Sequence, residues 1–301
     1  MMSVSVVMPA RNAAAYIGEA IKSVLAQGEH LHELIVVDDG SHDDTLAIVR
    51  GFDDPRVQLL TNPGNGVSSA RNAGARQATA AWLMFLDADD RLRTNTLATL
   101  VHATTTRPNA VAIYGNYDRI DGEGRSIGSR SLLLRHRRKP SGNVLERMVS
   151  GNFIVNGGIM IVRSRAFASI GGFDETLRYC EDWHCWCRLA ALGEFHFVPT
   201  YLMDYRVHDA NTMSAARTAR DFLPAVERIF NDRLVSTRLP AKLVPALRRM
   251  AEVHLMIYAA AQAVRFRRYA TALSYLSVVG RKSPLAVPRA ITTVGLAYFG
   301  T

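Results

Sequence analysis

Three carboxylates follow an apolar run directly in the segment WLMFLDADD, residues 82–90. The apolar run predicts a buried strand, so Asp87, Asp89 and Asp90 would lie just beyond its end. In an open α/β sheet, ligands bind at the carboxyl ends of the strands. Hard cations such as Mg²⁺ and Mn²⁺ prefer carboxylate oxygens and keep positions open for substrate phosphates. The spacing therefore predicts a site for a metal and a phosphorylated ligand. A polar turn in which Asp90 caps the next helix is the alternative.

The chain before this segment alternates short apolar runs with segments of helical period. We expect helices over residues 17–25, 45–52 and 68–78, and strands over residues 4–8 (ended by Pro9), 34–37, 57–60 and 82–86. This alternation indicates βαβ units and a mostly parallel sheet. Polar clusters follow three of these strands, which places them along one rim of the sheet.

A second group of candidate residues lies between residues 150 and 210. Residues 156–162 predict a glycine-rich loop that enters a strand, and residues 171–174 (GGFD) predict a tight turn. Glu181 and Asp182 then begin a helix, whose positive end would hold a carboxylate ionised. Such a carboxylate suits a general base that removes a proton from a hydroxyl group. Capping of the helix alone is the alternative.

Several short motifs occur together in one order and spacing. They are PARN (9–12), VVDDGS (36–41), SARNAG (69–74), LDADD (86–90), GGFD (171–174), ED (181–182) and YRVH (205–208). Over roughly residues 3–214 the chain therefore resembles family 2 glycosyltransferases, the large inverting group with the GT-A fold. The resemblance implies transfer of a sugar from a nucleotide diphosphate donor to a hydroxyl group.

The resemblance also implies a nucleoside site after the first two strands. By resemblance Asp39 contacts a uracil ring, which makes a UDP-sugar the expected donor, and Asp38 is the neighbouring candidate. A carboxylate accepts hydrogen bonds well from the imide or amino edge of a base. Pro9, Ala10 and Asn12 would line the same pocket. Capping of the following helix is the alternative, although later acidic residues fill that role more naturally.

For the acidic segment, the resemblance implies a direct metal ligand in Asp89. Asp87 would contact the ribose hydroxyls or bind the metal through water, and His208 would complete the metal shell or touch the diphosphate. Arg71 would pair with the diphosphate or brace Asp87, because a guanidinium suits both; a solvated surface position is its alternative. The divalent cation, Mn²⁺ or Mg²⁺, would neutralise charge on the leaving nucleoside diphosphate.

The catalytic base implied by the resemblance is Asp182, with Glu181 as the neighbouring alternate. Trp183 and Trp186 could form a stacking floor for a sugar, although their helical spacing is more typical of a core. The expected fold is α/β, a GT-A nucleotide-diphospho-sugar transferase fold with a C-terminal α-helical extension. We expect a catalytic domain over residues 1–215, divided into a nucleotide-binding half (1–115) and an acceptor half (116–215), and an extension over residues 216–301.

Positive charge is concentrated in that extension. Residues 217–301 contain 14 Lys and Arg against 4 Asp and Glu, whereas residues 1–216 contain 22 against 23. Apolar residues at 243, 247, 250, 253 and 257 predict a helix, and no stretch has the roughly eighteen apolar residues that span a bilayer. Basic amphipathic helices predict contact with an anionic membrane surface; a helical cap with a solvated basic face is the alternative. A second basic segment, residues 135–139, predicts a loop that guides an anionic acceptor or covers the donor, or is simply solvated.

The first residues predict a strand rather than a hydrophobic signal segment, which favours a cytoplasmic protein, peripheral on the inner face of the plasma membrane. The expected acceptor is a lipid-linked or cell-surface glycan precursor. Two other classes of protein share some of these features. A nucleotidyltransferase needs a glycine-rich loop after the first strand, and residues 8–12 contain no glycine. A nucleic-acid-binding protein fits a pI near 9.8, but the positive charge avoids the predicted site and no nucleic-acid motif is present, so no nucleic-acid partner is expected.

Overall fold

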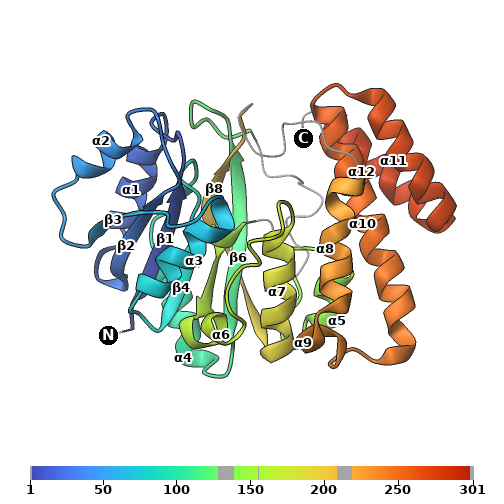
Figure 1. Cartoon of the computed structure of the whole chain (residues 1–301), viewed down its shortest axis with the longest axis horizontal. Helices are drawn as coiled ribbons and strands as arrows, with labels where there is room; N and C mark the ends of the chain where they lie inside the picture. Colours follow the sequence, from blue (N-terminus) through green and yellow to red (C-terminus); the bar gives the residue numbers. More distant parts are fainter. Residues whose placement is uncertain (1, 128–138, 155, 209–218, 299–301) are drawn as a thin grey trace.

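A computed structural model describes residues 2–127, 139–154, 156–208 and 219–298 of the chain (Figure 1). Its centre is one eight-stranded sheet with the order β3-β2-β1-β4-β7-β6-β8-β5. The strands are β1 (Val4–Ala10), β2 (Leu31–Asp38), β3 (Val57–Thr61), β4 (Trp82–Phe85), β5 (Arg91–Leu92), β6 (Ala112–Ile120), β7 (Met160–Arg163) and β8 (Phe195–Arg206). The α/β fold class that the sequence predicts is confirmed.

The two parts of the sheet differ in strand direction. Strands β3, β2, β1 and β4 are all parallel, as the alternation of strands and helices predicts. Strand β7 is antiparallel to both of its neighbours, β4 and β6, and β5 is antiparallel to β8. Strands β6 and β8 are parallel. The complete sheet is therefore mixed, because β7 runs opposite to the strands on either side of it.

Strand β1 continues past its predicted end. Pro9 pairs in register with Val37 of β2 and lies inside the strand. On its other side, β1 pairs with β4 only as far as Val7, whose carbonyl accepts the N–H of Leu86 at 3.0 Å. Alternate residues of a strand face the same neighbour, so Pro9 faces the β4 side beyond the end of that pairing. Its missing N–H costs no hydrogen bond there, which is why the strand tolerates it.

Helices cover this sheet and extend beyond it. Those of the sheet region are α1 (Ile17–Leu25), α2 (Thr45–Arg50), α3 (Val67–Gln77), α4 (Thr96–Thr106), α5 (Leu145–Val149), α6 (Ser164–Ser169) and α7 (Glu181–Leu192), with 3₁₀ turns η1 (Gly28–His30) and η2 (Gly157–Ile159). Helix α3 packs on β1 and β2, and α1 packs on β2 and β5. Both therefore cover the part of the sheet that contains β2.

The remaining helices form a bundle beside α5 and α7, at the right of Figure 1. They are α8 (Ala219–Asn231), α9 (Arg233–Ser236), α10 (Val244–Arg265), α11 (Tyr269–Lys282) and α12 (Val287–Tyr298), with 3₁₀ turns η4 (Ala241–Leu243) and η5 (Pro284–Ala286). A helical extension is thus confirmed. The predicted boundary at residue 215 lies outside the described residues, as do residues 135–138 of the basic segment.

The sequence correctly predicts the long helix α10, but one of the residues that it predicts on the inner face is exposed. Leu247, Val253 and Ile257 are buried, as the apolar repeat predicts, whereas Met250 is 53% exposed. Ala251, four residues after Leu247, takes the inward position, and its small side chain allows the neighbouring helices to pack there. None of the helices in the described ranges is long and apolar enough to cross a bilayer.

Candidate active site

The acidic loop begins where β4 ends, at the rim predicted from the sequence. Carboxylate oxygens of Asp87, Asp89 and Asp90 lie within 4.8 Å of one another. Asp90 is buried and accepts the N–H of Arg206 at 2.8 Å and the side-chain amide of Asn156 at 2.7 Å. It does not cap the next helix. Burial, together with Asp89 and Asp87, raises the pKa of Asp90 well above its usual range. Asp90 therefore fixes the loop, and the more accessible Asp87 and Asp89 face outward.

Two residues at the end of β8 approach the acidic loop. The Nε2 atom of His208 lies 2.9 Å from Oδ2 of Asp89. Arg206 donates from Nε to the backbone carbonyl of Asp89 at 2.8 Å. The ring of Tyr16 packs beside both, 5.0 Å from the His208 ring and 4.7 Å from the Arg206 guanidinium. His208 and Asp89, which the sequence predicts to share one metal, therefore lie side by side.

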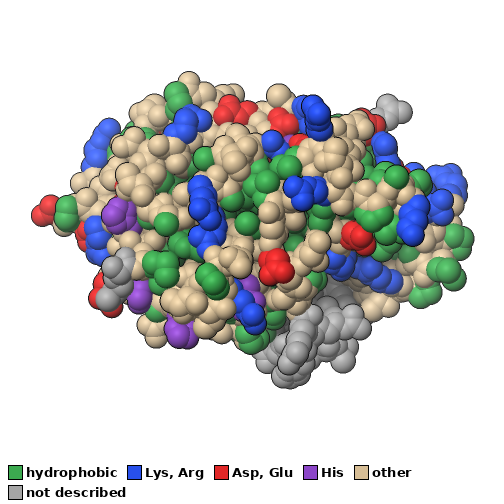
Figure 2. Space-filling model, turned by 90° about the horizontal axis from the view of Figure 1, so that it is seen from below, with side chains coloured by type: hydrophobic (Ala, Val, Ile, Leu, Met, Phe, Trp, Pro, Cys, Tyr) green, Lys and Arg blue, Asp and Glu red, His purple; other side chains and the backbone are tan. Residues whose placement is uncertain are grey.

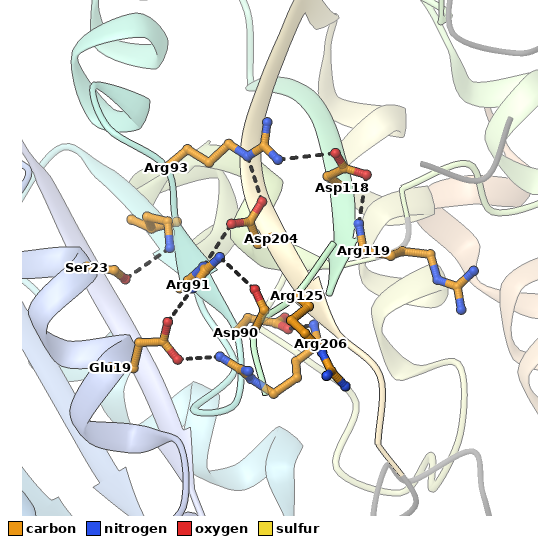
Figure 3. Close-up of polar contacts among 12 residues, drawn as sticks. Glu19, Ser23, Asp90, Arg91, Arg93, Asp118, Arg119, Arg125, Asp204 and Arg206 are labelled. Atoms are coloured by element: carbon orange, nitrogen blue, oxygen red, sulfur yellow. Dashed lines mark hydrogen bonds and ion pairs between the residues drawn. The ribbon is translucent and has the colours of Figure 1, made fainter. Parts of the chain in front are cut away.

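An ionic network holds this end of β8 to β5 and α1 (Figure 3). Glu19 accepts from Arg91 and Arg206, each at 2.5 Å. Asp204 accepts from Arg91 at 2.8 Å and from Arg93 at 2.6 Å. Arg206 is 2% exposed, so its charge depends on these partners. No local sequence pattern predicts this network, because its members are far apart in the chain.

Arg71 of α3 joins the acidic loop to the second half of the site. Its guanidinium lies 2.7 Å from Oδ1 of Asp87 and 3.0 Å from Oε1 of Glu181, and its side chain is 12% exposed. Burial opposes the charge, but the carboxylates of Asp87 and Glu181 outweigh it and raise the pKa of Arg71. Arg71 braces Asp87, one of the two roles expected, and is not a solvated surface residue. Its contact with Glu181 was not predicted.

The neighbouring residue of α3 fastens the glycine turn that precedes α7. The side-chain amide of Asn72 donates to the carbonyl of Phe173 at 2.9 Å and accepts its N–H at 2.8 Å. Gly172 has φ +81°, and a Cβ on it would come within 2.4 Å of the Asn72 side chain. The turn thus requires glycine at this position. It delivers the start of α7, with Glu181 and Asp182, to the site.

Asp182 lies in the first turn of α7. One of its oxygens accepts from the side-chain amide of Asn152 at 3.2 Å, and the other from the N–H of Trp183 at 2.6 Å. The helix terminus was expected to keep this carboxylate ionised. Instead burial, with the charge of Glu181, outweighs the backbone N–H and raises the pKa of Asp182 to about 7. A carboxyl group that titrates near neutrality suits proton transfer.

At the end of β2, the two aspartates have different surroundings. Asp38 is buried and accepts the N–H groups of Gly40 and Ser41, which shapes the turn. Asp39 accepts from the side chain of Asn62 at 2.7 Å and from the N–H of Gly66 at 2.9 Å. Asp39 thus holds the loop between β3 and α3.

The residues after β1 lie next to these aspartates. The carbonyl of Ala10, which follows Pro9, accepts the N–H of Asp39 at 2.8 Å. Asn12 has φ +50°, and its side chain accepts the N–H of His42 at 2.8 Å. All residues predicted to line the nucleoside site are therefore gathered at the carboxyl ends of β1 and β2.

Two further observations concern side chains around the site. Trp183 and Trp186 are each 1% exposed, and the indole of Trp183 donates to the carbonyl of Met148 at 2.7 Å, so both belong to the core. Asn156 was missed as a site residue. Its amide donates to Asp87 at 3.1 Å as well as to Asp90, which ties η2 to the acidic loop. An asparagine before two glycines predicts a bend in the chain, but it does not show which residues the asparagine side chain contacts.

The carboxylate oxygens of the acidic loop fit a hard divalent cation, because their mutual repulsion would be relieved by one. A mixed sheet with this acidic loop after β4 and a carboxylate at the start of α7 defines a GT-A-type fold. Solved structures agree with this class. A structure of S. aureus TarS residues 1–349 in complex with UDP-GlcNAc has a TM-score of 0.68 at 18% identity and covers 99% of this chain and 89% of that one.

Residues 5–170 match glycosyl transferase family 2. The chain therefore belongs to this family. An uncharacterized glycosyltransferase of Rickettsia typhi is 29% identical over 214 residues, which cover 71% of this chain and 66% of that protein. The matched part is thus just under two thirds of that relative's length. The Escherichia coli enzyme WfgD, a UDP-Glc:alpha-D-GlcNAc-diphosphoundecaprenol beta-1,3-glucosyltransferase, is 39% identical over 119 residues, 39% of this chain and 47% of the enzyme.

Proposed function

We propose that this protein transfers one sugar from a UDP-sugar to a hydroxyl group of a glycan acceptor, with inversion at the anomeric carbon. The observation that carries the proposal is the Arg71 bridge. Arg71 holds Asp87, in the acidic loop, and Glu181, beside the candidate base Asp182. Donor binding and proton removal are thereby confined to one site, which a transfer between two bound substrates requires.

In this proposal the nucleoside half is residues 1–115. Asp39 receives the base, and the backbone of Pro9 and Ala10 with Asn12 lines the nucleoside pocket. Asp89 and Asp87, with His208 beside them, would hold Mn²⁺ or Mg²⁺. A bound cation supplies charge neutralisation for the leaving diphosphate.

The acceptor half, residues 116–215, supplies the base. Asp182 removes the acceptor proton, and the amide of Asn152 fixes the orientation of its carboxylate. Lone pairs of the Asp182 oxygens that these hydrogen bonds do not use would accept the proton of the acceptor hydroxyl as it attacks the anomeric carbon. Because its pKa is raised to about 7, Asp182 is basic enough to take the proton, and about half of it is ionised at neutral pH.

Named relatives support the proposed substrates. WfgD uses, by its name, a UDP-glucose donor and a diphosphoundecaprenol-linked acceptor, and TarS binds UDP-GlcNAc. We therefore infer a UDP-sugar donor for this chain, and a lipid-linked or cell-surface glycan precursor as its acceptor.

The C-terminal helices, residues 216–301, support a peripheral place on an anionic membrane. Leu273, Leu285 and Ile291 are 67%, 95% and 61% exposed, on α11, η5 and α12. Arg281 and Arg289, also exposed, alternate with them along the chain. Figure 2 shows hydrophobic and basic side chains next to each other over the end of the molecule that these helices form. Exposed leucines can enter the acyl boundary while arginines bind anionic headgroups. The inner face of the plasma membrane is the proposed location.

The proposed function is tested by donor binding and turnover. A panel of nucleotide sugars is screened by thermal shift with and without Mn²⁺, and UDP release is then followed for each stabilising donor. We expect stabilisation by a UDP-sugar that depends on Mn²⁺, and UDP release that Asp182→Asn abolishes without loss of the thermal shift. The absence of any stabilising nucleotide sugar would refute the proposal.

A further inference from the structure

The partly buried ammonium group of Lys139 lies over aromatic rings of the acceptor half. The Nζ atom of Lys139 is 5.8 Å from the ring centre of Tyr117 on β6 and 5.9 Å from that of Phe197 on β8. Both rings are half-buried. A cation over two ring faces is held by their electron density, but it keeps its N–H donors for a further ligand.

Lys139 has no carboxylate partner among the residues whose positions are described, in contrast to Lys282, which lies 2.5 Å from Glu252. Burial alone lowers the pKa of Lys139 to about 8. The eleven residues before it, 128–138, contain four arginines and no acidic residue. A partly desolvated cation without a counter-ion favours binding of an anion.

Contacts between aromatic rings lead from Lys139 to the candidate base. Tyr114 lies between Phe197 and Phe153, with ring centres 5.3 Å and 5.8 Å away, and its hydroxyl donates to the carbonyl of Pro140 at 2.6 Å. Phe153 directly follows Asn152, which donates to Asp182. Tyr114 is fully buried and packs beneath the surface, whereas Tyr117, Phe153 and Phe197 are half-buried. We name these three half-buried rings the aromatic strip. Lys139 lies at one end of the strip, and Asp182 lies beside its other end.

Further cations stand on the same side. Burial and the charge of Arg289, on α12, lower the pKa of Arg147, on α5, and Arg147 in turn acts on the Tyr114 hydroxyl. No carboxylate pairs with Arg147 or Arg289 among the residues with described positions. The electrostatic potential around Tyr114 and Lys139 is therefore positive, opposite in sign to that around the acidic loop. A site of this composition attracts an acceptor that is itself anionic.

We propose that the aromatic strip and Lys139 form an acceptor site for a phosphate-bearing glycan, in which a sugar ring lies on the strip and Lys139 binds the phosphate. The inference rests on the proposed glycosyl transfer and adds the chemical class of the acceptor. Aromatic faces stack on the apolar face of a sugar, and an ammonium is a point-charge ligand for phosphate. The phosphate can belong to a lipid diphosphate or to a soluble polyol phosphate.

The test uses full-length protein saturated with UDP and Mn²⁺, so that the donor site is filled. Ligand-observed NMR titrations compare α-glucose 1-phosphate with its neutral counterpart, methyl α-glucoside. Two further probes distinguish the sources of phosphate: N-acetylglucosamine diphosphate with a farnesyl chain, and a glycerol phosphate trimer. Lys139→Gln removes the charge, Lys139→Arg keeps it, and Lys22→Gln removes an exposed lysine of α1 as the matched control.

We expect the wild type to bind the phosphate-bearing sugar about tenfold more tightly than the neutral one. Lys139→Gln should lose that preference, whereas Lys139→Arg and Lys22→Gln should keep it. A preference for the farnesyl probe alone assigns the phosphate to a lipid, and one shared with the trimer assigns it to a polyol phosphate. Equal binding of the charged and neutral sugars, or an undiminished preference in Lys139→Gln, would overturn this inference but not the proposed function. Failure of the wild type to bind UDP with Mn²⁺ would overturn the proposed function and this inference with it.

Discussion

Arg71 and Glu181 form an ion pair at 3.0 Å although 110 residues separate them in the chain. Because Arg71 also holds Asp87, one guanidinium connects the acidic loop after β4 to the start of α7. The two elements are contributed by opposite halves of the sheet region. Their relative position, and hence the geometry of the site, depends on this side chain.

Substitution of Arg71 tests that dependence. Arg71→Gln leaves two carboxylates facing each other without their shared cation, so we expect a loss of stability near the lower end of roughly 3–5 kcal/mol, since Asp87 is partly exposed. Urea denaturation measures it. Arg76→Gln, at an exposed position of the same helix, is the matched control and should change stability by less than about 0.5 kcal/mol. Equal stability of both variants would contradict the bridge.

The metal-ligand role proposed for Asp89 gives a second prediction. Asp89→Asn should reduce Mn²⁺-stimulated turnover on the order of 10²-fold or more, because the charge on the leaving diphosphate is then poorly neutralised. The fold should persist, since removal of one of three adjacent carboxylates reduces repulsion. UDP release is measured against Mn²⁺ concentration, with the exposed Asp44→Asn as control. A full response to Mn²⁺ in Asp89→Asn would exclude this role.

The raised pKa of Asp182 predicts the pH dependence of transfer. Protonation removes the base, so kcat/KM should fall about tenfold for each pH unit below about 7 and level off above it. The sign for stability is the opposite: because the folded-state pKa lies above the unfolded value, ionisation of Asp182 destabilises the fold as pH rises from about 4 to 7. Asp182→Asn should lose both sugar transfer and the acidic limb of the kcat/KM profile. A wild-type rate that stays constant from pH 5 to 8 would remove Asp182 as the base.

Glu181 should tune that titration. Its charge is, after burial, the main cause of the raised pKa of Asp182. Glu181→Gln should therefore shift the acidic limb of the kcat/KM profile to lower pH, with Asp182 still active as the base. If Glu181 were itself the base, the variant would lose transfer at every pH. The pH profile of the variant distinguishes these two roles, which the sequence leaves open.

Local patterns in the sequence predicted what depends on local structure. The apolar run before Asp87, the helical period over Ile17–Leu25 and the start of α7 at Glu181 all follow from neighbours within a few residues. Pro9 was assigned as a strand end because local rules cannot see that β4 stops pairing beside it. Glu19 had no recognisable signal, since its partner Arg206 is 187 residues away. The antiparallel direction of β7 escaped prediction for the same reason, because strand pairing is a long-range property.

The C-terminal helices give the last prediction, which concerns membrane contact. Leu285 is 95% exposed, so Leu285→Glu should leave the fold unchanged. Burial of a leucine contributes about 1.5–3 kcal/mol, and we expect this variant to bind vesicles of phosphatidylcholine and phosphatidylglycerol about tenfold more weakly or worse. Arg281→Gln should also weaken binding, and added salt should remove its effect, since headgroup attraction is screened. Co-sedimentation measures both, with Leu192→Gln at the exposed end of α7 as the matched control. Equal sedimentation of wild type, Leu285→Glu and Arg281→Gln would show that the basic helices only cover the catalytic part, because a surface that binds lipid cannot be indifferent to both its apolar and its charged residues.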